Sequence, residues 1–423
     1  MSASHSSTTT LDQLFLGRQP ILEPSGTLIG YELLFRDSQL NRADAVVPGV
    51  AMADVVCKAF AELGLADALG GNKAFLIADA AFLQHEAIEA LPPEQVVFEV
   101  LAEQLHNPVL MERCLLLNER GYVFCLRDPA ELDEATLLFL RQSMFMKLNL
   151  KALPEETLTR FLNLPADFRP LAIASHVETA ADHAHAKALG FQFFQGYYFA
   201  EPTLVEGKKL DPATQGLIRI INLIHADADS SEIEQAFKSE TALTVKLLRL
   251  TNSVGVGLRV RISSVKQAIN VIGRRHIQRW LQLLLYSNHG AGDAFERNPL
   301  MQLAALKGRF MELLAGYAQP RNRDLAEQAF LVGMMSLMPA ALGMPIAAIL
   351  EQIDIALPLR DALLTHEGDL GQLLSLTECF DNEDVAGTQA ALDNVGPNVS
   401  PELMNRCLAD SIAWVQALAT QAD

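Results

Sequence analysis

Ionisable and amide side chains recur at the ends of short apolar runs in the first half of the chain. The set contains three glutamates, an aspartate, an arginine, a lysine and a glutamine: Glu32, Arg36, Glu99, Asp128, Lys147, Glu178 and Gln195. Taken singly, each would be read as a surface charge in a loop. Several carboxylates that converge on one mouth repel one another unless cations are bound there or basic side chains lie between them. The pattern therefore predicts either a cation site or a set of internal ion pairs.

The elements that must position these side chains are repeated β–α units. The expected strands are Leu28–Leu34, Ala74–Ile77, Val96–Val100, Tyr122–Leu126, Met144–Leu148, Leu171–Ala174 and Phe191–Phe194. Helical stretches such as Asp54–Leu69 and Thr179–Leu189 lie between them, each followed by glycine as a helix C-cap. This alternation predicts a parallel (β/α) barrel with its functional residues at the C-terminal ends of the strands. Because such barrels typically take about 250 residues, a trimmed barrel is expected.

The pattern changes after Pro202. Thr203–Asp211 reads as a linker, and apolar residues then recur at helical spacing in Ala213–His225, Ser231–Phe237, Ala242–Thr251 and Val265–Asn288. We therefore expect an α/β plus all-α chain, with a barrel domain at 12–204 and a helical domain at 205–423.

Composition restricts the class of protein. The chain has 423 residues, 50% of them hydrophobic, with 33 Lys and Arg against 51 Asp and Glu. This composition excludes a disordered chain, and the net charge of −18 opposes sequence-independent DNA binding. Five scattered cysteines, with no export signal and no long apolar run, predict a cytoplasmic protein without a membrane span.

Ordered motifs in the first half resemble the EAL domain, the cyclic di-GMP phosphodiesterase barrel. They are LGRQPI at 16–21, GYELLFR at 30–36, VET at 177–179 and FQGYYF at 194–199. The second half resembles an HDOD domain through LLRLTNS at 247–253, ISSVKQAI at 262–269 and FLVGMMSL at 330–337. The order of the two parts and the short barrel are similar to bacterial EAL-plus-HDOD signalling proteins.

The resemblance implies roles for the polar residues. In active EAL domains, carboxylates and an asparagine hold two Mg²⁺ or Mn²⁺ ions that activate a water against one phosphodiester. Glu32 and Glu99 match metal-binding glutamates, and Asp128 matches the second of a pair of aspartates. Lys147 matches the active-site lysine, and Glu178 matches a late glutamate near the second metal. Two further matches are ligand contacts: Arg36 for phosphate and Gln195 for guanine.

Five positions depart from the family's pattern. Ile77 stands in place of the asparagine ligand, and Arg127 in place of the aspartate that bridges both metals. The others are Ala102 for a loop-organising glutamate, Asn149 for an aspartate, and Ser175 for a glutamate that is a candidate general base. The loss of both ligands predicts a catalytically inactive barrel.

Arg127 is the most damaging of these changes. A guanidinium cannot be deprotonated in a protein and offers only donors. Two unit charges about 4 Å apart interact by roughly 4 kcal/mol at an effective dielectric near 20, and a divalent ion would be repelled about twice as strongly. Two arrangements are open to Arg127: it turns to solvent while Asp79 supplies an oxygen, or it pairs with Glu32 or Glu99 and neutralises the site without metal. The second is preferred.

The helical half shows no metal motif. It has no His-Asp dipeptide, and Ser336-Leu337 stands where related phosphohydrolases place one. Its main basic stretch is formed by Arg259, Arg261, Lys266, Arg274, Arg275 and Arg279. A solvated face is preferred for this stretch over a nucleic-acid site, because stacking side chains are not interleaved with it.

The sequence supports two candidate functions of different classes, a binding protein and an enzyme. The preferred one is a non-enzymatic signalling adaptor that binds protein partners, with cyclic di-GMP as a candidate ligand and with no cofactor. The alternative is an active cyclic di-GMP phosphodiesterase with altered ligation of Mg²⁺ or Mn²⁺. Nucleic acid and membrane are not expected partners, and self-association is left open.

Overall fold

The structure is a computed structural model that describes residues 14–37, 49–168, 170–202, 210–254, 262, 264–287, 295–353 and 355–421. It divides into two compact units, one of Met1–Glu201 with Leu376–Gln416 and one of Pro202–Ser375 with Ala417–Asp423. The predicted linker Thr203–Asp211 and the predicted boundary at 204/205 fall largely on residues 203–209, which lie outside the described residues. That boundary stays a prediction.

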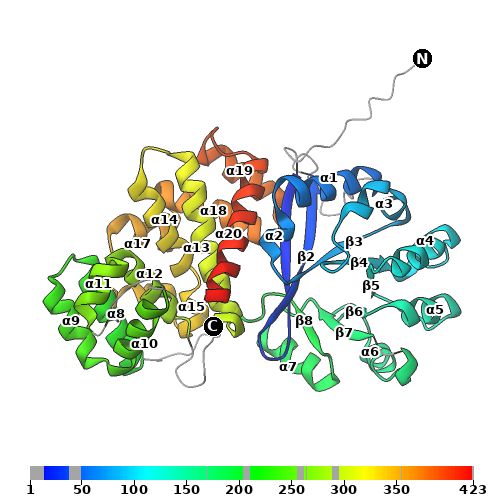
Figure 1. Ribbon diagram of the computed structural model, residues 1–423, viewed down its shortest axis with the longest axis horizontal. Helices are drawn as coiled ribbons and strands as arrows, with labels where there is room; N and C mark the ends of the chain where they lie inside the picture. The colour runs from blue at the N-terminus through cyan, green and yellow to red at the C-terminus, as the bar shows by residue number, and fades with distance from the viewer. Residues whose placement is uncertain are drawn as a thin grey trace, which may run out of the picture. The chain divides into compact units, whose positions relative to one another are not determined.

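The first unit contains a closed eight-stranded barrel in the order β1 to β8 (Figure 1). The strands are β1 (Leu14–Leu22), β2 (Leu28–Asp37), β3 (Lys73–Ile77), β4 (Val96–Leu101), β5 (Val123–Arg127), β6 (Phe145–Asn149), β7 (Leu171–Ser175) and β8 (Phe193–Gln195). Strands β2 to β8 pair in parallel, whereas β1 is antiparallel to both β2 and β8. The predicted fold class is confirmed, and β1 is a strand that the sequence analysis did not name.

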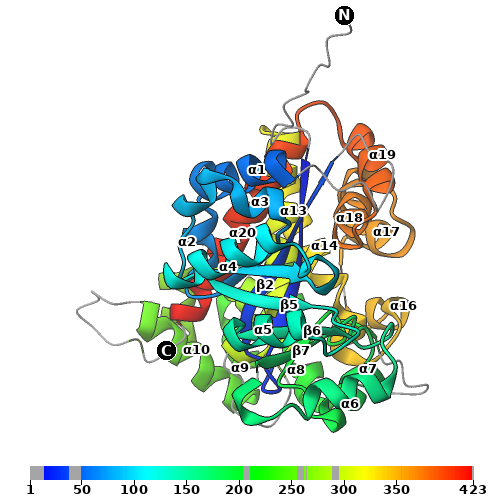
Figure 2. The same ribbon diagram turned by 90° about the vertical axis from the view of Figure 1, so that its right-hand side faces the viewer.

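Helices connect the parallel strands and lie around their outside (Figures 1 and 2). They are α1 (Gly49–Glu62), α2 (Leu65–Leu69), α3 (Ala80–Gln84), η2 (Glu86–Ala90), η3 (Ala102–Gln104), α4 (Pro108–Glu119), α5 (Glu134–Gln142), α6 (Glu155–Leu162), η4 (Ala166–Phe168) and α7 (Ala180–Leu189). Helix α7 begins with a capping box between Thr179 and Asp182. It ends at Leu189 with Gly190 as its C-cap, as the sequence predicted. The predicted helix Asp54–Leu69 is two helices, because Gly64 adopts the left-handed conformation before α2.

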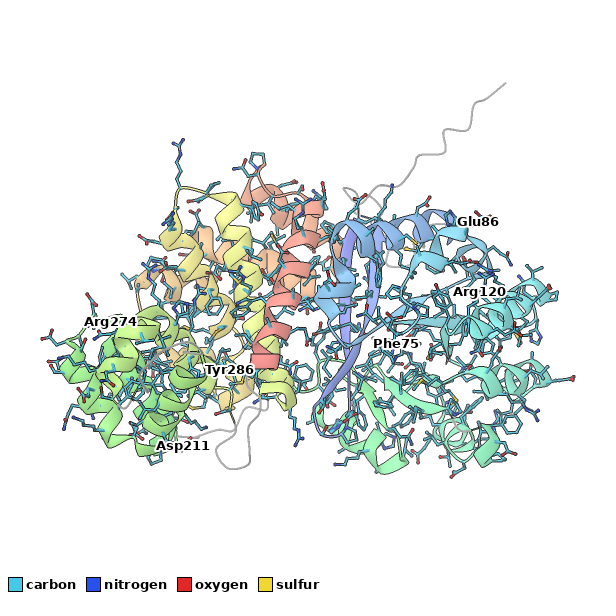
Figure 3. All side chains as sticks on the ribbon, viewed as in Figure 1. Phe75, Glu86, Arg120, Asp211, Arg274 and Tyr286 are labelled. Carbon is cyan, nitrogen blue, oxygen red and sulfur yellow. The ribbon has the colours of Figure 1, made fainter. Side chains whose placement is uncertain are left out.

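The barrel interior is filled by alternate side chains of successive strands. Ile21, Phe75, Val97, Cys125, Phe145 and Ile173 form one buried cluster. Phe75 lies inside the ring of strands (Figure 3), where its ring packs edge-on against Phe145. Since side chains alternate along a strand, residues two positions beyond this layer also point inward, at the C-terminal ends of the parallel strands.

Residues near the C-terminal end of the chain pack against the β1–β2 hairpin. A turn at 23–27 joins β1 to β2 without a helix, so the connection itself supplies nothing to cover these strands. The backbone N–H of Leu16 donates to Asn405 Oδ1 at 2.8 Å, and Asn405 Nδ2 donates to the Leu14 carbonyl at 2.7 Å. Phe15 and Phe380 pack edge to face. Residues Leu376–Gln416, which the sequence analysis assigned to the helical domain, thus group with the barrel.

The described part of the remaining chain is helical. Its helices are α8 (Pro212–His225), α9 (Ser230–Ser239), α10 (Thr241–Val254), α11 (Val265–Ile272), α12 (Arg274–Leu284), η5 (Phe295–Arg297), α13 (Pro299–Ala318), α14 (Arg323–Met335), α15 (Met338–Leu342), α16 (Ile346–Leu350), α17 (Leu357–Thr365), α18 (Gly368–Asp381), α19 (Val385–Val395) and α20 (Pro401–Gln421). The predicted segment Val265–Asn288 is interrupted at Gly273, whose φ of 85° ends α11. Among the described residues, Arg323–Leu342 is long and apolar enough to span a membrane, but half of it is buried within the protein, as in a core helix.

Candidate functional site

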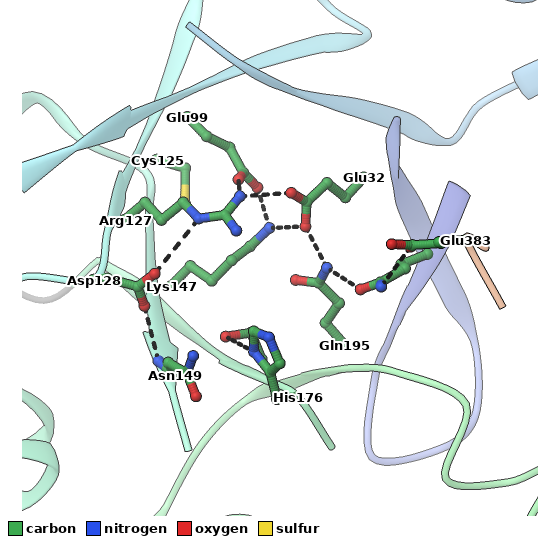
Figure 4. Close-up of polar contacts among 12 residues, drawn as sticks. Glu32, Glu99, Cys125, Arg127, Asp128, Lys147, Asn149, His176, Gln195 and Glu383 are labelled. Atoms are coloured by element: carbon green, nitrogen blue, oxygen red, sulfur yellow. Dashed lines mark hydrogen bonds and ion pairs between the residues drawn. The ribbon is translucent and has the colours of Figure 1, made fainter. Parts of the chain in front are cut away.

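Five polar side chains meet inside the C-terminal mouth of the barrel (Figure 4). Each comes from a different strand: Glu32 from β2, Glu99 from β4, Arg127 from β5, Lys147 from β6 and Gln195 from β8. Glu32, Glu99 and Lys147 are at most 2% exposed, although burial of charge is costly unless the charge is paired. Four of the seven side chains that the sequence analysis singled out, Glu32, Glu99, Lys147 and Gln195, therefore converge.

Two cations and two carboxylates neutralise one another in this mouth. Arg127 Nη1 lies 2.5 Å from Glu32 Oε1 and 3.0 Å from Glu99 Oε2. Lys147 Nζ lies 3.0 Å from Glu32 Oε2 and also pairs with Glu99. Each cation thus bridges both carboxylates, and the preferred arrangement of Arg127 from the sequence is present. We call Glu32, Glu99, Arg127 and Lys147 the ion-pair network.

The network shifts the pKa values of its members. Burial alone would raise the pKa of Glu32, but Lys147 and Arg127, with a hydrogen bond from Gln195, lower it to about 2. Burial and the neighbouring Glu32 carboxylate raise the pKa of Glu99. Burial disfavours the charged form of Lys147, yet the two glutamates raise its pKa above the ordinary value. The Lys147 ammonium and the Glu32 carboxylate are therefore both charged at neutral pH.

The donor set does not fit a pair of divalent ions. Hard cations need several free oxygen ligands, and both buried carboxylates already bind cationic nitrogen atoms. Ile77 ends β3 beside Glu99 with an aliphatic side chain. Asp79 is held as the N-cap of α3 by the Phe82 amide, so it is already engaged there. Within the described ranges, no cluster of three or more His, Cys, Asp or Glu could hold a metal.

Asp128 and Asn149 lie at the edge of the network and organise backbone. Asp128 has a φ of 48° and accepts from the Asn149 N–H at 3.0 Å, while its other oxygen is 3.5 Å from Arg127 Nε. Asn149 Oδ1 accepts from the amides of Lys151 and Ala152. Both side chains thus shape the loop after β6.

The remaining predicted positions lie outside the network. Glu178 is exposed and pairs with Lys151. The Ser175 hydroxyl donates to the Leu148 carbonyl at 3.3 Å and contacts His176 Nδ1 at the same distance. Ala102 starts the short helix η3, and its methyl side chain offers no donor or acceptor. The structure therefore does not bring Glu178 together with Glu32 and Glu99.

The two predicted ligand contacts are joined through residues that the sequence analysis gave no role. Gln195 Nε2 donates to Glu32 and, at 2.8 Å, to Gln19 Oε1. Gln19 Nε2 donates in turn to Glu383 Oε1 at 2.8 Å, and Arg36 pairs with the same carboxylate. Figure 4 shows this chain of contacts running from Glu383 to Glu32.

The sequence contains a motif that could have pointed to Gln19, but none that could have pointed to Glu383. Gln19 lies in the LGRQPI motif and faces Glu32 across the β1–β2 pair. Glu383 follows α18 in a turn without any motif, 347 residues from Arg36. Contacts at such separation depend on the tertiary fold, which local spacing does not encode.

In the helical unit, three described arginines of the basic stretch are paired internally. Arg274 lies 2.6 Å from Asp227, Arg275 lies 2.6 Å from Glu327, and Arg279 pairs with Glu312. Arg259 and Arg261 lie outside the described residues. The paired arginines are better accounted for by a solvated, salt-bridged face than by a nucleic-acid site.

Comparisons with known proteins agree with this arrangement of parts. A family model described as "HDOD domain" matches residues 211–343. The chain is 29% identical over 388 residues to the Vibrio cholerae protein named cyclic di-GMP phosphodiesterase CdgJ, covering 90% of this chain and 88% of that one. It is 24% identical over 411 residues to Bacillus subtilis YuxH, covering 96% and 99% of the two chains.

Among solved structures, the Klebsiella pneumoniae BlrP1 complex with calcium and cyclic di-GMP has a TM-score of 0.38 and 20% identity. It covers 48% of this chain, which in turn spans only 58% of the BlrP1 chain. The barrel itself is established by its strand order. The chain therefore has an EAL-plus-HDOD architecture, with a closed barrel that carries the EAL-like motifs followed by a region that matches the HDOD family model.

Proposed function

We propose that this protein is a cytoplasmic cyclic di-GMP signalling adaptor whose barrel does not hydrolyse the dinucleotide. The observation that supports it is the position of Arg127, whose guanidinium bridges Glu32 and Glu99 at 2.5 and 3.0 Å. In the EAL resemblance these two carboxylates are metal ligands. Here their charge is balanced by protein cations, so the affinity for Mg²⁺ or Mn²⁺ is low.

A protein partner is the output that the remaining features support. Neither the barrel mouth nor the described helices supply a metal-ligating cluster. The HDOD match covers helices whose Ser336-Leu337 stands where a metal motif would be needed. Surface recognition is a function that both parts retain without such chemistry. Self-association remains compatible with this proposal.

The alternative is an active phosphodiesterase with altered metal ligation. It is favoured by the name of CdgJ, which is 29% identical over most of both chains. Glu32, Glu99 and Lys147 are also retained at the positions that the resemblance implies. It requires the Arg127 guanidinium to leave two buried carboxylates, and breaking buried ion pairs of this kind costs about 3–5 kcal/mol.

A hydrolysis assay distinguishes the adaptor from the phosphodiesterase. The full-length protein is incubated with cyclic di-GMP and either Mg²⁺ or Mn²⁺, and the nucleotides are then analysed by chromatography. We expect no linear dinucleotide above the blank. Metal-dependent turnover that disappears in Glu32→Ala would establish the phosphodiesterase instead. Turnover that persists in Glu32→Ala would identify a contaminating enzyme.

A further inference from the structure

Arg36 is occupied by a carboxylate from the protein's own C-terminal segment. Arg36 Nη1 donates to the main-chain carbonyl of Glu383 at 2.9 Å, and Nη2 pairs with the Glu383 carboxylate. Gln19 Nε2 donates to the other carboxylate oxygen at 2.8 Å. The Arg36 and Glu383 side chains are only 27% and 17% exposed. A charge-assisted, partly buried pair of this kind is stronger than a surface ion pair.

The backbone around Glu383 is shaped to present this group. Glu383 adopts the left-handed conformation with a φ of 61°, directly between the end of α18 and Asp384, which caps α19. A non-glycine residue pays about 1 kcal/mol or more there, and glycine is the residue that this conformation favours. The contacts with Arg36 and Gln19 offset that cost, so the side chain rather than the backbone accounts for glutamate at this position.

The turn is held in place on both sides. Phe380, three residues earlier, packs against Phe15, and Asn405 binds the edge of β1. The Glu383 carboxylate is therefore a tethered group, and a tethered group acts at an effective concentration on the order of millimolar or above. A free anion must compete with it for Arg36.

We infer that the Glu383 turn is an autoinhibitory latch that closes the barrel's anion site against phosphodiester ligands. This inference rests on the proposed function, because it takes cyclic di-GMP as the ligand that binds in the barrel mouth. Glu383 and a ligand phosphate both need the Arg36 guanidinium, so they exclude each other. Gln19 also links Glu383 to Gln195, so opening of the latch releases Gln19, which neighbours the amide that the resemblance assigns to guanine. Ligand binding and release of the turn are then one coupled equilibrium.

Calorimetric titration of the full-length protein with cyclic di-GMP in buffer with EDTA tests the latch. The key variant is Glu383→Gly, which removes the carboxylate and suits the left-handed backbone. If the latch is open about one time in ten, its loss tightens apparent binding about tenfold, because apparent affinity scales with the competent fraction. Glu383→Gln should give a smaller gain, since an amide still reaches Gln19 but lacks charge. Arg36→Ala in the Glu383→Gly background should remove the gain.

The matched control is Asn382→Gly, which changes the neighbouring residue of the same turn and leaves the Glu383 carboxylate and its partners in place. It should bind as the wild type does. Equal affinities of the wild type and Glu383→Gly, absence of binding to both, or the same gain in Asn382→Gly would each overturn the latch. Because the titration contains no divalent metal, hydrolysis in the separate Mg²⁺ or Mn²⁺ assay bears on the proposed function alone.

Discussion

At the scale of single residues, the main feature of the barrel mouth is a positive charge at a position where the EAL resemblance implies a negative one. Arg127 stands where the EAL resemblance places an acidic ligand, and it binds the two glutamates that would otherwise share metal. Lys147, which the resemblance retains, pairs with the same two carboxylates from the other side. Two positive and two negative groups therefore close the network without an external ion. The carboxylates that the resemblance implies as metal ligands are thus members of an internal ion-pair network in this structure.

The low pKa of Glu32 predicts a specific dependence of stability on pH. A carboxyl whose pKa falls from 4.5 to about 2 on folding stabilises the protein by about 3 kcal/mol above pH 4.5, and this contribution is lost as pH falls through about 2. Glu32→Gln should therefore be about 3 kcal/mol less stable than the wild type at pH 7. The difference should shrink steadily between pH 4.5 and 2. Urea unfolding of both proteins across this range measures it.

The wild type must be compared with a variant because Glu99 contributes to the pH dependence of stability with the opposite sign to Glu32. Its raised pKa means that its contribution falls as pH rises through the folded value. The control is Glu112→Gln, on the exposed surface of α4, which should change stability by no more than about 0.5 kcal/mol at any pH. A difference between wild type and Glu32→Gln that stays constant from pH 5 to pH 2.5 would contradict the assigned role of Glu32.

At the scale of elements, the β1–β2 hairpin depends on one asparagine. Asn405 is 1% exposed and satisfies both the Leu16 N–H and the Leu14 carbonyl. In Asn405→Ala both backbone groups lose their partner, and buried unsatisfied groups cost about 1–3 kcal/mol each. We expect a loss of about 2–4 kcal/mol and faster hydrogen exchange at the Leu16 amide. Gln389→Ala on α19 is the control, and equal exchange at Leu16 in both variants would contradict this role.

The same elements show which features of the structure could be predicted from the sequence. The network was predictable because Glu32, Glu99 and Lys147 each lie in the C-terminal half of an apolar run, and parallel strands bring these halves to one edge. Strand β1 was not named, since its residues read as a motif rather than as part of a β–α unit. Helix breaks at Gly64 and Gly273 depend on single backbone conformations. Asn405 and Glu383 were not predictable, because their partners lie more than 340 residues away.

At the scale of the whole molecule, the chain returns to its first unit after completing most of the second. Leu376–Gln416 belong to the barrel unit although they follow the HDOD match at 211–343. The barrel therefore needs residues from both ends of the sequence. Expression of 12–204 alone would leave the edge of β1 without Asn405 and Phe15 without Phe380, so we expect this fragment to be less stable than the whole first unit.

This topology predicts the behaviour of a nicked protein. A protease site engineered between residues 203 and 209 divides the chain into an N-terminal fragment and one that retains Leu376–Gln416. Because the contacts of Asn405, Phe380 and Glu383 with the barrel are non-covalent and survive the cut, we expect the two fragments to elute together in size-exclusion chromatography. The same nick in Asn405→Ala should give measurable separation, since two buried hydrogen bonds to β1 are lost. Complete separation of the fragments in the otherwise unaltered sequence would show that the C-terminal segment does not hold the barrel, whereas co-elution would confirm that the first unit is assembled from both ends of the chain.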